Sequence, residues 1–80
     1  MPSVTVYSKP GCQPCRMTKI HLNKAGVEFQ EVDVTTDPDA LEMLQSKGFQ
    51  QVPVVMVGEE ESWSGLRMDK IKALAELIPA

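Results

Sequence analysis

The chain has 80 residues, of which 42% are apolar and 24% charged, which is enough for one globular domain over residues 1–80 and too few for a second. Its net charge of −3 argues against general nucleic-acid binding, and its longest apolar run without glycine is far shorter than the roughly 20 residues that cross a membrane. The N-terminus lacks the basic start and apolar core of a secretion signal, so we expect a cytoplasmic protein without membrane or nucleic-acid partners.

The first predicted elements are a strand and a helix. Residues 3–7 alternate valine with threonine and tyrosine and are rich in β-branched side chains, which is the pattern of a strand. A Lys-Pro-Gly sequence at 9–11 ends that strand. Residues 12–25 then carry a broad apolar stripe with a charged back, and Gly26 is placed to cap the helix that this stripe predicts.

A second strand is predicted within residues 27–34, where the apolar side chains change phase. Val27 and Phe29 are spaced for one face of a strand, whereas Val32 and Val34 are spaced for the opposite face. The alternation therefore indicates a strand in this segment but does not define its first residue.

A short helix and a buried strand come next. Asp37 is a capping residue immediately before Pro38, which suits the first helical position, and a Lys-Gly pair at 47–48 ends the helix. Residues 52–57 form a continuous apolar run with a proline near its start, where a strand loses no ladder hydrogen bond. That run predicts a buried strand.

The last elements complete a mixed sheet. A turn at Gly58 leads to a short return strand at 62–64, and apolar residues at helical spacing predict a final helix over 68–78 that Pro79 stops. The order is then βαβαββα. Strand, helix and strand in succession require a parallel crossover, whereas the short turn requires an antiparallel pair. We therefore predict an α/β fold in which three helices flank a four-stranded mixed sheet.

Cys12 and Cys15 are the two cysteines of the chain, and they stand where the first strand gives way to the first helix. A disulfide between them closes too short a loop to stabilise the fold much, so the pair needs a chemical explanation. Backbone N–H groups at a helix start favour the thiolate of Cys12, which makes Cys12 the expected nucleophile. Three basic residues nearby add to the positive electrostatic field at Cys12: Lys9, Arg16 and Lys19. Pro14 loses no intrahelical hydrogen bond in the first turn, and it stiffens the loop.

These cysteines predict a dithiol cycle, in which Cys12 attacks a target disulfide and the less exposed Cys15 resolves the mixed disulfide. Two binding functions could use the same thiolates: a zinc site, and an iron–sulfur cluster shared between two chains. A closed zinc site needs four ligands and His21 is the one histidine, so we expect no metal site within the chain. Two incidental free cysteines are a further alternative.

Three stretches together resemble the NrdH-redoxins, which are glutaredoxin-like proteins with thioredoxin-like activity. They are Val-Tyr-Ser-Lys-Pro-Gly-Cys-Gln-Pro-Cys at 6–15, Val-Pro at 52–53 and Trp-Ser-Gly-Leu-Arg at 63–67, and the resemblance runs nearly the whole length of the chain. It implies a thioredoxin/glutaredoxin-like fold and a redox-active Cys12–Cys15 disulfide with no cofactor, and we expect a monomer. It also implies two partners: the large subunit of a class Ib ribonucleotide reductase, which receives electrons, and thioredoxin reductase, which supplies them.

The resemblance also assigns roles to residues. Pro53 matches a proline that faces the active-site pair and is cis throughout the superfamily; Lys9, Pro14 and Val52 are the other expected supports of the pair. The residues expected to bind the partner are these: Trp63, Ser64, Gly65 and Arg67. Glutaredoxins that use glutathione commonly have a Gly-Gly turn and an acidic residue here. Because only Gly65 is present, thioredoxin reductase is favoured over the glutathione alternative.

The chain departs from the family pattern at a few positions. Pro14 stands immediately before the second cysteine, where the family usually has a glutamine, and this is the proline placement of thioredoxin itself. Leu66 and Met68 replace a phenylalanine and a proline of the family. A tryptophan followed by a helix entry also suits a core position, which would explain Trp63 without a partner.

Overall fold

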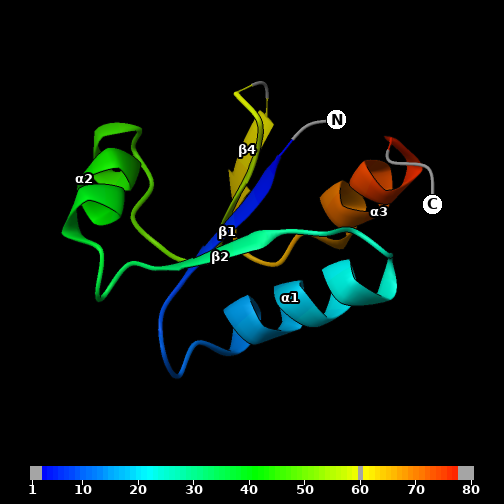
Figure 1. Ribbon diagram of the computed structural model, residues 1–80, viewed down its shortest axis with the longest axis horizontal. Coiled ribbons are helices and arrows are strands. Elements are labelled where there is room, and N and C mark those ends of the chain that lie inside the picture. Colours follow the sequence, from blue (N-terminus) through cyan, green and yellow to red (C-terminus); the bar gives the residue numbers. More distant parts are fainter. Residues whose placement is uncertain (1–2, 60, 78–80) are drawn as a thin grey trace.

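The computed structural model describes residues 3–59 and 61–77. Within these residues the elements follow one another in the predicted order, βαβαββα, which is confirmed. They are β1 (Val4–Ser8), α1 (Gln13–Lys24), β2 (Gln30–Asp33), α2 (Pro38–Ser46), β3 (Val54–Val57), β4 (Glu61–Ser64) and α3 (Met68–Leu77) (Figure 1). The residues predicted to end and stop the last helix, 78 and 79, lie outside the described residues.

The described strands form one four-stranded sheet in the order β2-β1-β3-β4. β1 and β2 are parallel, with Ser8 opposite Asp33, because α1 carries the chain back to the same end of the sheet. β3 is antiparallel to both β1 and β4, and the short connection between β3 and β4 requires the second of these pairings. The predicted mixed sheet is therefore confirmed.

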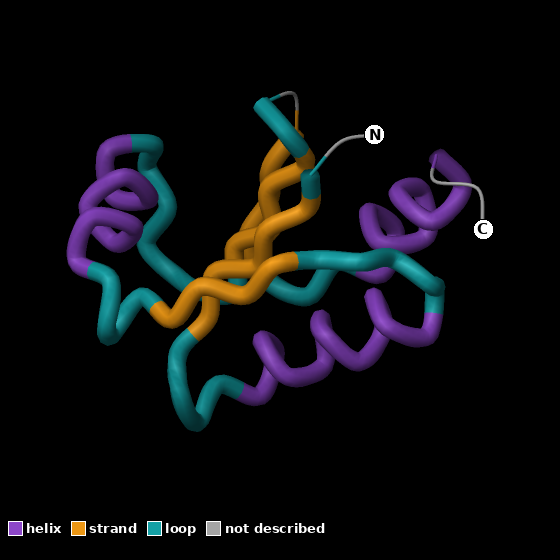
Figure 2. Tube along the Cα trace, in the orientation of Figure 1, coloured by secondary structure: helices purple, strands orange, loops and turns teal. Residues whose placement is uncertain are grey.

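Helices cover both faces of this sheet (Figure 2). α1 and α3 pack on one face, over a core made of these buried residues: Val4, Val6, Leu22, Val27, Val55, Val57, Trp63, Ile71 and Leu74. α2 packs on the other face, over a smaller core of Val34, Leu44 and Val54. Because both faces are covered, reactive groups reach partners at the ends of the strands, where the loops lie.

The change of phase within residues 27–34 is a change of sheet face. Val27 and Phe29 pack with the α1/α3 core, whereas Val34 packs in the α2 core. β2 itself begins at Gln30, later than the apolar pattern suggests. Within β2, Glu31 contacts α1 through a hydrogen bond from Lys19 rather than through an apolar side chain. This segment thus gives apolar side chains to one core before β2 begins and to the other after it ends.

The predicted capping residues begin and end the helices. The Asp37 carboxylate accepts a hydrogen bond from the Ala40 N–H at 3.1 Å, and Pro38 is the first residue of α2. Gly26, with a φ of 75°, follows the C-cap of α1. The helices are short: in the described part of the chain, none is long and apolar enough to cross a membrane.

Candidate functional site

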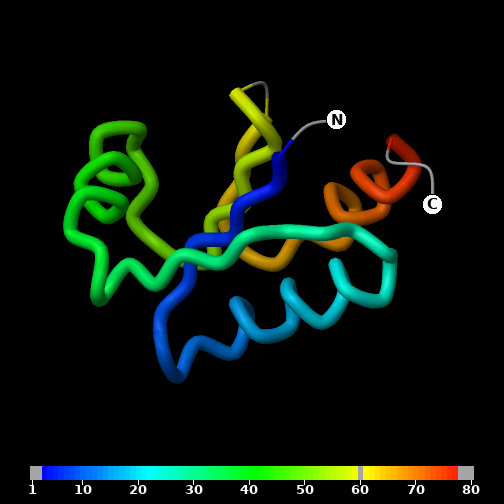
Figure 3. The backbone as a smooth tube through the Cα atoms, viewed as in Figure 1, coloured from blue at the N-terminus to red at the C-terminus, as the bar shows by residue number. Residues whose placement is uncertain are grey.

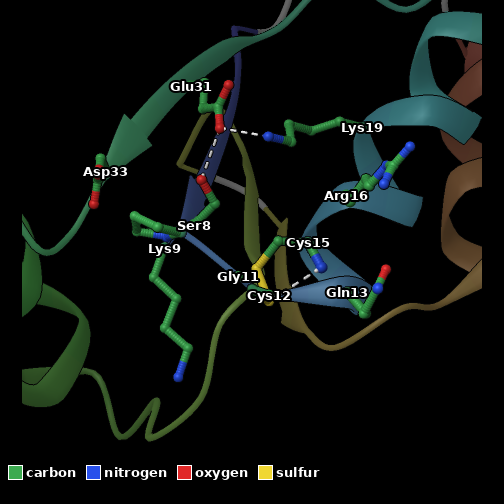
Figure 4. A pocket seen from close by; sticks show the side chains of 11 residues that line it. Ser8, Lys9, Gly11, Cys12, Gln13, Cys15, Arg16, Lys19, Glu31 and Asp33 are labelled. Carbon is green, nitrogen blue, oxygen red and sulfur yellow. Dashed lines mark hydrogen bonds and ion pairs between the residues drawn. A yellow bond between two sulfur atoms is a disulfide. The ribbon is translucent and has the colours of Figure 1, made fainter.

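The two cysteines lie at one end of the sheet, where β1 ends and α1 begins (Figure 4). Gly11, with a φ of 74°, helps to turn the chain between these elements. Cys12 and Cys15 are joined by a disulfide, and their Cα atoms are 5.3 Å apart. Cys15 is 1% exposed while Cys12 is half-buried, so an incoming sulfur atom reaches Cys12 first.

The start of α1 stabilises negative charge on the Cys12 sulfur. Cys12 is the N-cap of the helix, and the Cys15 N–H donates a hydrogen bond to Cys12 Sγ at 3.2 Å. The first turn of α1 carries no acidic side chain, and Pro14 within it has no N–H to leave unpaired. The positive end of the helix dipole is therefore directed at Cys12 without an opposing charge in that turn.

Thr18 supports this turn from inside the molecule. Its side chain is fully buried, and its hydroxyl donates a hydrogen bond to the Pro14 carbonyl at 2.8 Å. Thr18 was not among the residues predicted at the site. The one available signal was its spacing, because a threonine in a helix can hydrogen-bond to the carbonyl four residues earlier.

The chain between α2 and β3 returns to the same end of the sheet as the disulfide (Figure 3). The Val52–Pro53 peptide bond is cis. The Val52 carbonyl oxygen lies 3.8 Å from Cys12 Sγ, which is a contact rather than a hydrogen bond because the disulfide sulfur carries no proton. The Pro53 carbonyl accepts a hydrogen bond from the Gly65 N–H at 2.8 Å. This loop thus lies against Cys12 and also holds the segment that leads to α3.

A hollow of about 410 Å³ opens beside the disulfide, between α1 and the ends of β1 and β2. Both cysteines line it, together with these charged residues: Lys9, Arg16, Lys19, Glu31 and Asp33. Glu31 Oε2 accepts hydrogen bonds from Lys19 Nζ at 2.6 Å and from the buried Ser8 hydroxyl at 2.8 Å (Figure 4). The hydrogen bond from Lys19, followed by that from Ser8, holds the pKa of Glu31 below its ordinary 4.5.

Ser8, Glu31 and Asp33 were not predicted as neighbours of the cysteines. A signal for them was available in the predicted topology, because parallel strands end at the same edge of a sheet and ligands bind at that edge in α/β folds. The period of two along a strand also places Glu31 and Asp33 on one face. Which face that is depends on the register of β2, which the phase change obscured.

A second hollow, of about 650 Å³, lies between the active-site loop and α2. Cys12 and Val52 line it, whereas Cys15 does not. Much of the remaining lining is apolar or amide side chains: Pro14, Val34, Leu41, Leu44, Phe49, Gln13, Gln45, Gln50 and Gln51. Apolar side chains with interspersed amides suit an extended polypeptide, whose side chains and backbone need these two kinds of contact.

The basic residues expected to act on Cys12 have different surroundings. Lys19 is engaged by Glu31, so its charge is largely balanced within the protein. Lys9 and Arg16 are exposed and line the hollow, and in Figure 4 the Lys9 side chain extends away from the two sulfurs. The positive group that contacts Cys12 directly is the N–H of Cys15 at the start of α1, rather than one of these three side chains.

The four residues expected to bind a partner do not form one surface. Trp63 is 5% exposed and belongs to the α1/α3 core, so its ring is not available for docking in this structure. Ser64 is exposed, and Gly65 has a φ of 84° at the turn toward α3. Arg67 is exposed but forms a two-pronged ion pair with Asp69, at 3.0 and 3.2 Å. Ser64 and Arg67 thus remain the accessible members of this group.

Among residues 3–59 and 61–77, no group of three or more histidine, cysteine, aspartate or glutamate side chains is arranged to hold a metal ion. His21 lines neither of the two hollows described above; it lies in a groove between α1 and α3 beside Lys24 and Met68. Within the described part of one chain, the two cysteines therefore have no third metal ligand.

Comparisons with known proteins match the chain along most of its length. The family model for glutaredoxin matches residues 4–61. The glutaredoxin-like protein NrdH of Salmonella typhimurium is 44% identical over 72 residues, which are 90% of this chain and 88% of the relative. The NrdH protein of Lactococcus lactis is 33% identical over 72 residues, covering 90% of this chain and 99% of the relative.

A solved structure agrees with these sequence matches. The NrdH-redoxin of Escherichia coli superimposes with a TM-score of 0.87 at 38% identity, covering 98% of this chain and 97% of that one. The predicted thioredoxin/glutaredoxin-like fold is confirmed by this match.

Proposed function

Because the chain belongs to the glutaredoxin family and is a thiol-disulfide redox protein of the NrdH type, we propose that Cys12 and Cys15 carry electrons from thioredoxin reductase to the large subunit of a class Ib ribonucleotide reductase. The observation that supports this most directly is the geometry at the start of α1. A half-buried Cys12 sulfur receives the Cys15 N–H, and the buried Cys15 sulfur is already bonded to it. We further propose that residues 1–80 act as one monomeric domain in the cytoplasm, without nucleic-acid partners.

The first step is attack on the target. The Cys12 thiolate attacks one sulfur of a target disulfide, forming a mixed disulfide and releasing the other target sulfur as a thiolate. The helix N-terminus favours the charged form of Cys12 that this step needs. The target segment carrying the disulfide would lie in the hollow beside α2, next to the Val52 carbonyl.

The second step is resolution by Cys15. Its thiolate attacks the Cys12 sulfur, which forms the Cys12–Cys15 disulfide and releases the second target sulfur. The target gains two electrons and, after protonation, two thiols, while this protein is oxidised. Because the Cα atoms are 5.3 Å apart, within the usual range for a disulfide, Cys15 reaches Cys12 without a rearrangement of the backbone. The dithiol of thioredoxin reductase reverses the oxidation by the same exchange.

Two observations favour thioredoxin reductase over glutathione as the electron source. The Escherichia coli relative is described by its thioredoxin-like activity profile, and the same activity would pair this chain with a dithiol reductase. In addition, a single glycine, Gly65, follows β4 where glutathione-using glutaredoxins commonly have a Gly-Gly turn and an acidic residue. We propose Ser64 and Arg67 as surface contacts of the reductase, whereas Trp63 packs in the core and does not itself touch the reductase.

The test is a pair of coupled assays on the purified protein. With NADPH, thioredoxin reductase and a class Ib ribonucleotide reductase, the protein should sustain deoxyribonucleotide formation, and Cys12→Ser should abolish it. With glutathione, glutathione reductase and a glutathione mixed disulfide, turnover should be far slower. Turnover in the second assay alone would instead make the protein a glutathione-dependent glutaredoxin.

A separate measurement addresses the metal-binding alternative. Protein purified without oxygen should be colourless, free of iron and zinc, and monomeric in sedimentation analysis. A dimeric preparation with stoichiometric iron and a visible absorbance band would instead indicate a cluster shared between two chains.

A further inference from the structure

A charged pair next to the disulfide has no role in the dithiol cycle described above. Lys19 Nζ lies 2.6 Å from Glu31 Oε2, and the same carboxylate oxygen accepts the Ser8 hydroxyl at 2.8 Å (Figure 4). Ser8 is buried, whereas the side chains of Lys19 and Glu31 are 29% and 45% exposed. The three residues belong to β1, α1 and β2, so this cluster joins three elements at the edge where the cysteines lie.

Lys19 is placed to act on the two sulfurs if it is not restrained. Cys15 and Lys19 are four residues apart on one face of α1, and Cys12, the N-cap, precedes Cys15 by three residues on the same side. Long side chains on a helix lean toward its N-terminus, which is the direction of the disulfide. All three residues line the same hollow. Without its partner, the Lys19 ammonium could therefore extend into the space beside the sulfurs.

We propose that Glu31 is a positioning residue that sets the reduction potential of the Cys12–Cys15 pair by holding the Lys19 ammonium against β2. This inference rests on the proposed dithiol chemistry of the two cysteines. Reduction by an external dithiol transfers two electrons to the disulfide and leaves a thiolate on Cys12 in part of the molecules. A free cation nearby would stabilise that thiolate and hence the reduced form. By balancing the charge of Lys19, Glu31 makes the reduced protein a stronger electron donor than it would be with a free Lys19 ammonium.

Other charged groups also face the hollow: Lys9 from the loop before α1, Arg16 from α1, and Asp33 from β2. Asp33 is occupied by Thr35, whose backbone N–H and hydroxyl donate to it at 2.8 and 2.6 Å. Lys9, Arg16 and Asp33 are unchanged in every variant described below. Differences among those variants therefore report on the Lys19–Glu31 pair alone.

The experiment measures the equilibrium of each folded variant with reduced and oxidised dithiothreitol. Glu31→Gln should shift the equilibrium about threefold toward the reduced protein, a potential less negative by about 14 mV at 29.6 mV per tenfold. Lys19→Gln should shift it in the opposite direction, because it leaves an uncompensated carboxylate beside the sulfurs. The double variant should return close to the wild type. Glu28→Gln is the matched control, since Glu28 is exposed and does not line the hollow, and it should not change the potential.

Two results would overturn this proposal. One is a shift in Glu31→Gln no larger than that in Glu28→Gln. The other is an equal shift in Glu31→Gln and the double variant, since that would reflect loosening of β2 from α1 rather than a free charge. The assay involves neither reductase, so the proposal about Glu31 would stand even if the protein did not use the two partners proposed above. A wild-type disulfide that did not exchange with dithiothreitol would refute both the dithiol chemistry and the role of Glu31.

Discussion

Replacing Trp63 with phenylalanine distinguishes a core tryptophan from one that binds a partner. Trp63 is 5% exposed, and its indole Nε1 is buried without a hydrogen-bond acceptor among residues 3–59 and 61–77. The smaller ring leaves a void of roughly 40 Å³, which at about 24 cal/mol per Å³ costs about 1 kcal/mol. The lost apolar contact costs about 1 kcal/mol more. Removing an unpaired buried donor gains about 1–3 kcal/mol, so the two effects nearly cancel.

Trp63→Phe should therefore unfold in urea within about 1 kcal/mol of the wild type, with a melting temperature changed by no more than about 4–8 °C. Trp63→Ala, which empties the site, should lose about 3–5 kcal/mol. KM for thioredoxin reductase should be the same for Trp63→Phe and the wild type, because the ring does not reach the surface. Destabilisation of Trp63→Phe by more than about 2 kcal/mol would show that the indole N–H is satisfied. A stable variant with a raised KM would show that the indole itself contributes to docking.

Three other substitutions and conditions test the site. Cys15→Ser should trap a mixed disulfide between Cys12 and the target, visible on a non-reducing gel, and normal turnover of this variant would rule out the dithiol cycle. Arg67→Ala should raise KM for thioredoxin reductase about two- to fivefold while reduction by dithiothreitol is unchanged. Lys72→Ala, which removes another exposed cation in the middle of α3, is the control, and an equal effect of both substitutions would remove the special role of Arg67. The pKa of Glu31 is lower in the folded protein than its ordinary 4.5, so the unfolded chain binds the proton more tightly. The contribution of Glu31 to the free energy of unfolding is therefore fully present above pH 4.5 and is lost as the pH falls below 4.5. Between about pH 6 and about pH 3.5, urea unfolding should therefore show that the free energy of unfolding falls by about 0.5 kcal/mol more for the wild type than for Glu31→Gln. The difference is small because the Lys19–Glu31 pair is partly exposed. Equal losses in the two proteins would contradict the presence of this pair in the folded state.

Local signals predicted the fold well because they act over a few residues. A capping aspartate before a proline begins α2, and a glycine with positive φ follows α1, as the sequence indicated. The weak point was the segment before β2, where Val27 and Phe29 suggested strand residues. Their side chains pack with the α1/α3 core from a non-strand segment, and alternation alone does not distinguish these two arrangements.

The sequence by itself determined the order of the elements and the position of Cys12 at the start of a helix, because periodicity and capping depend on neighbours within one or two turns. Only the tertiary structure decided which residues surround that sulfur: Val52 returns to it from beyond α2, and Glu31 reaches across from β2 to hold Lys19. It also decided that Trp63 lies in the core, since burial depends on which sheet face a residue occupies and which helices cover that face. These contacts join residues far apart in the chain, and the register of strand pairing that creates them is not encoded in any local stretch.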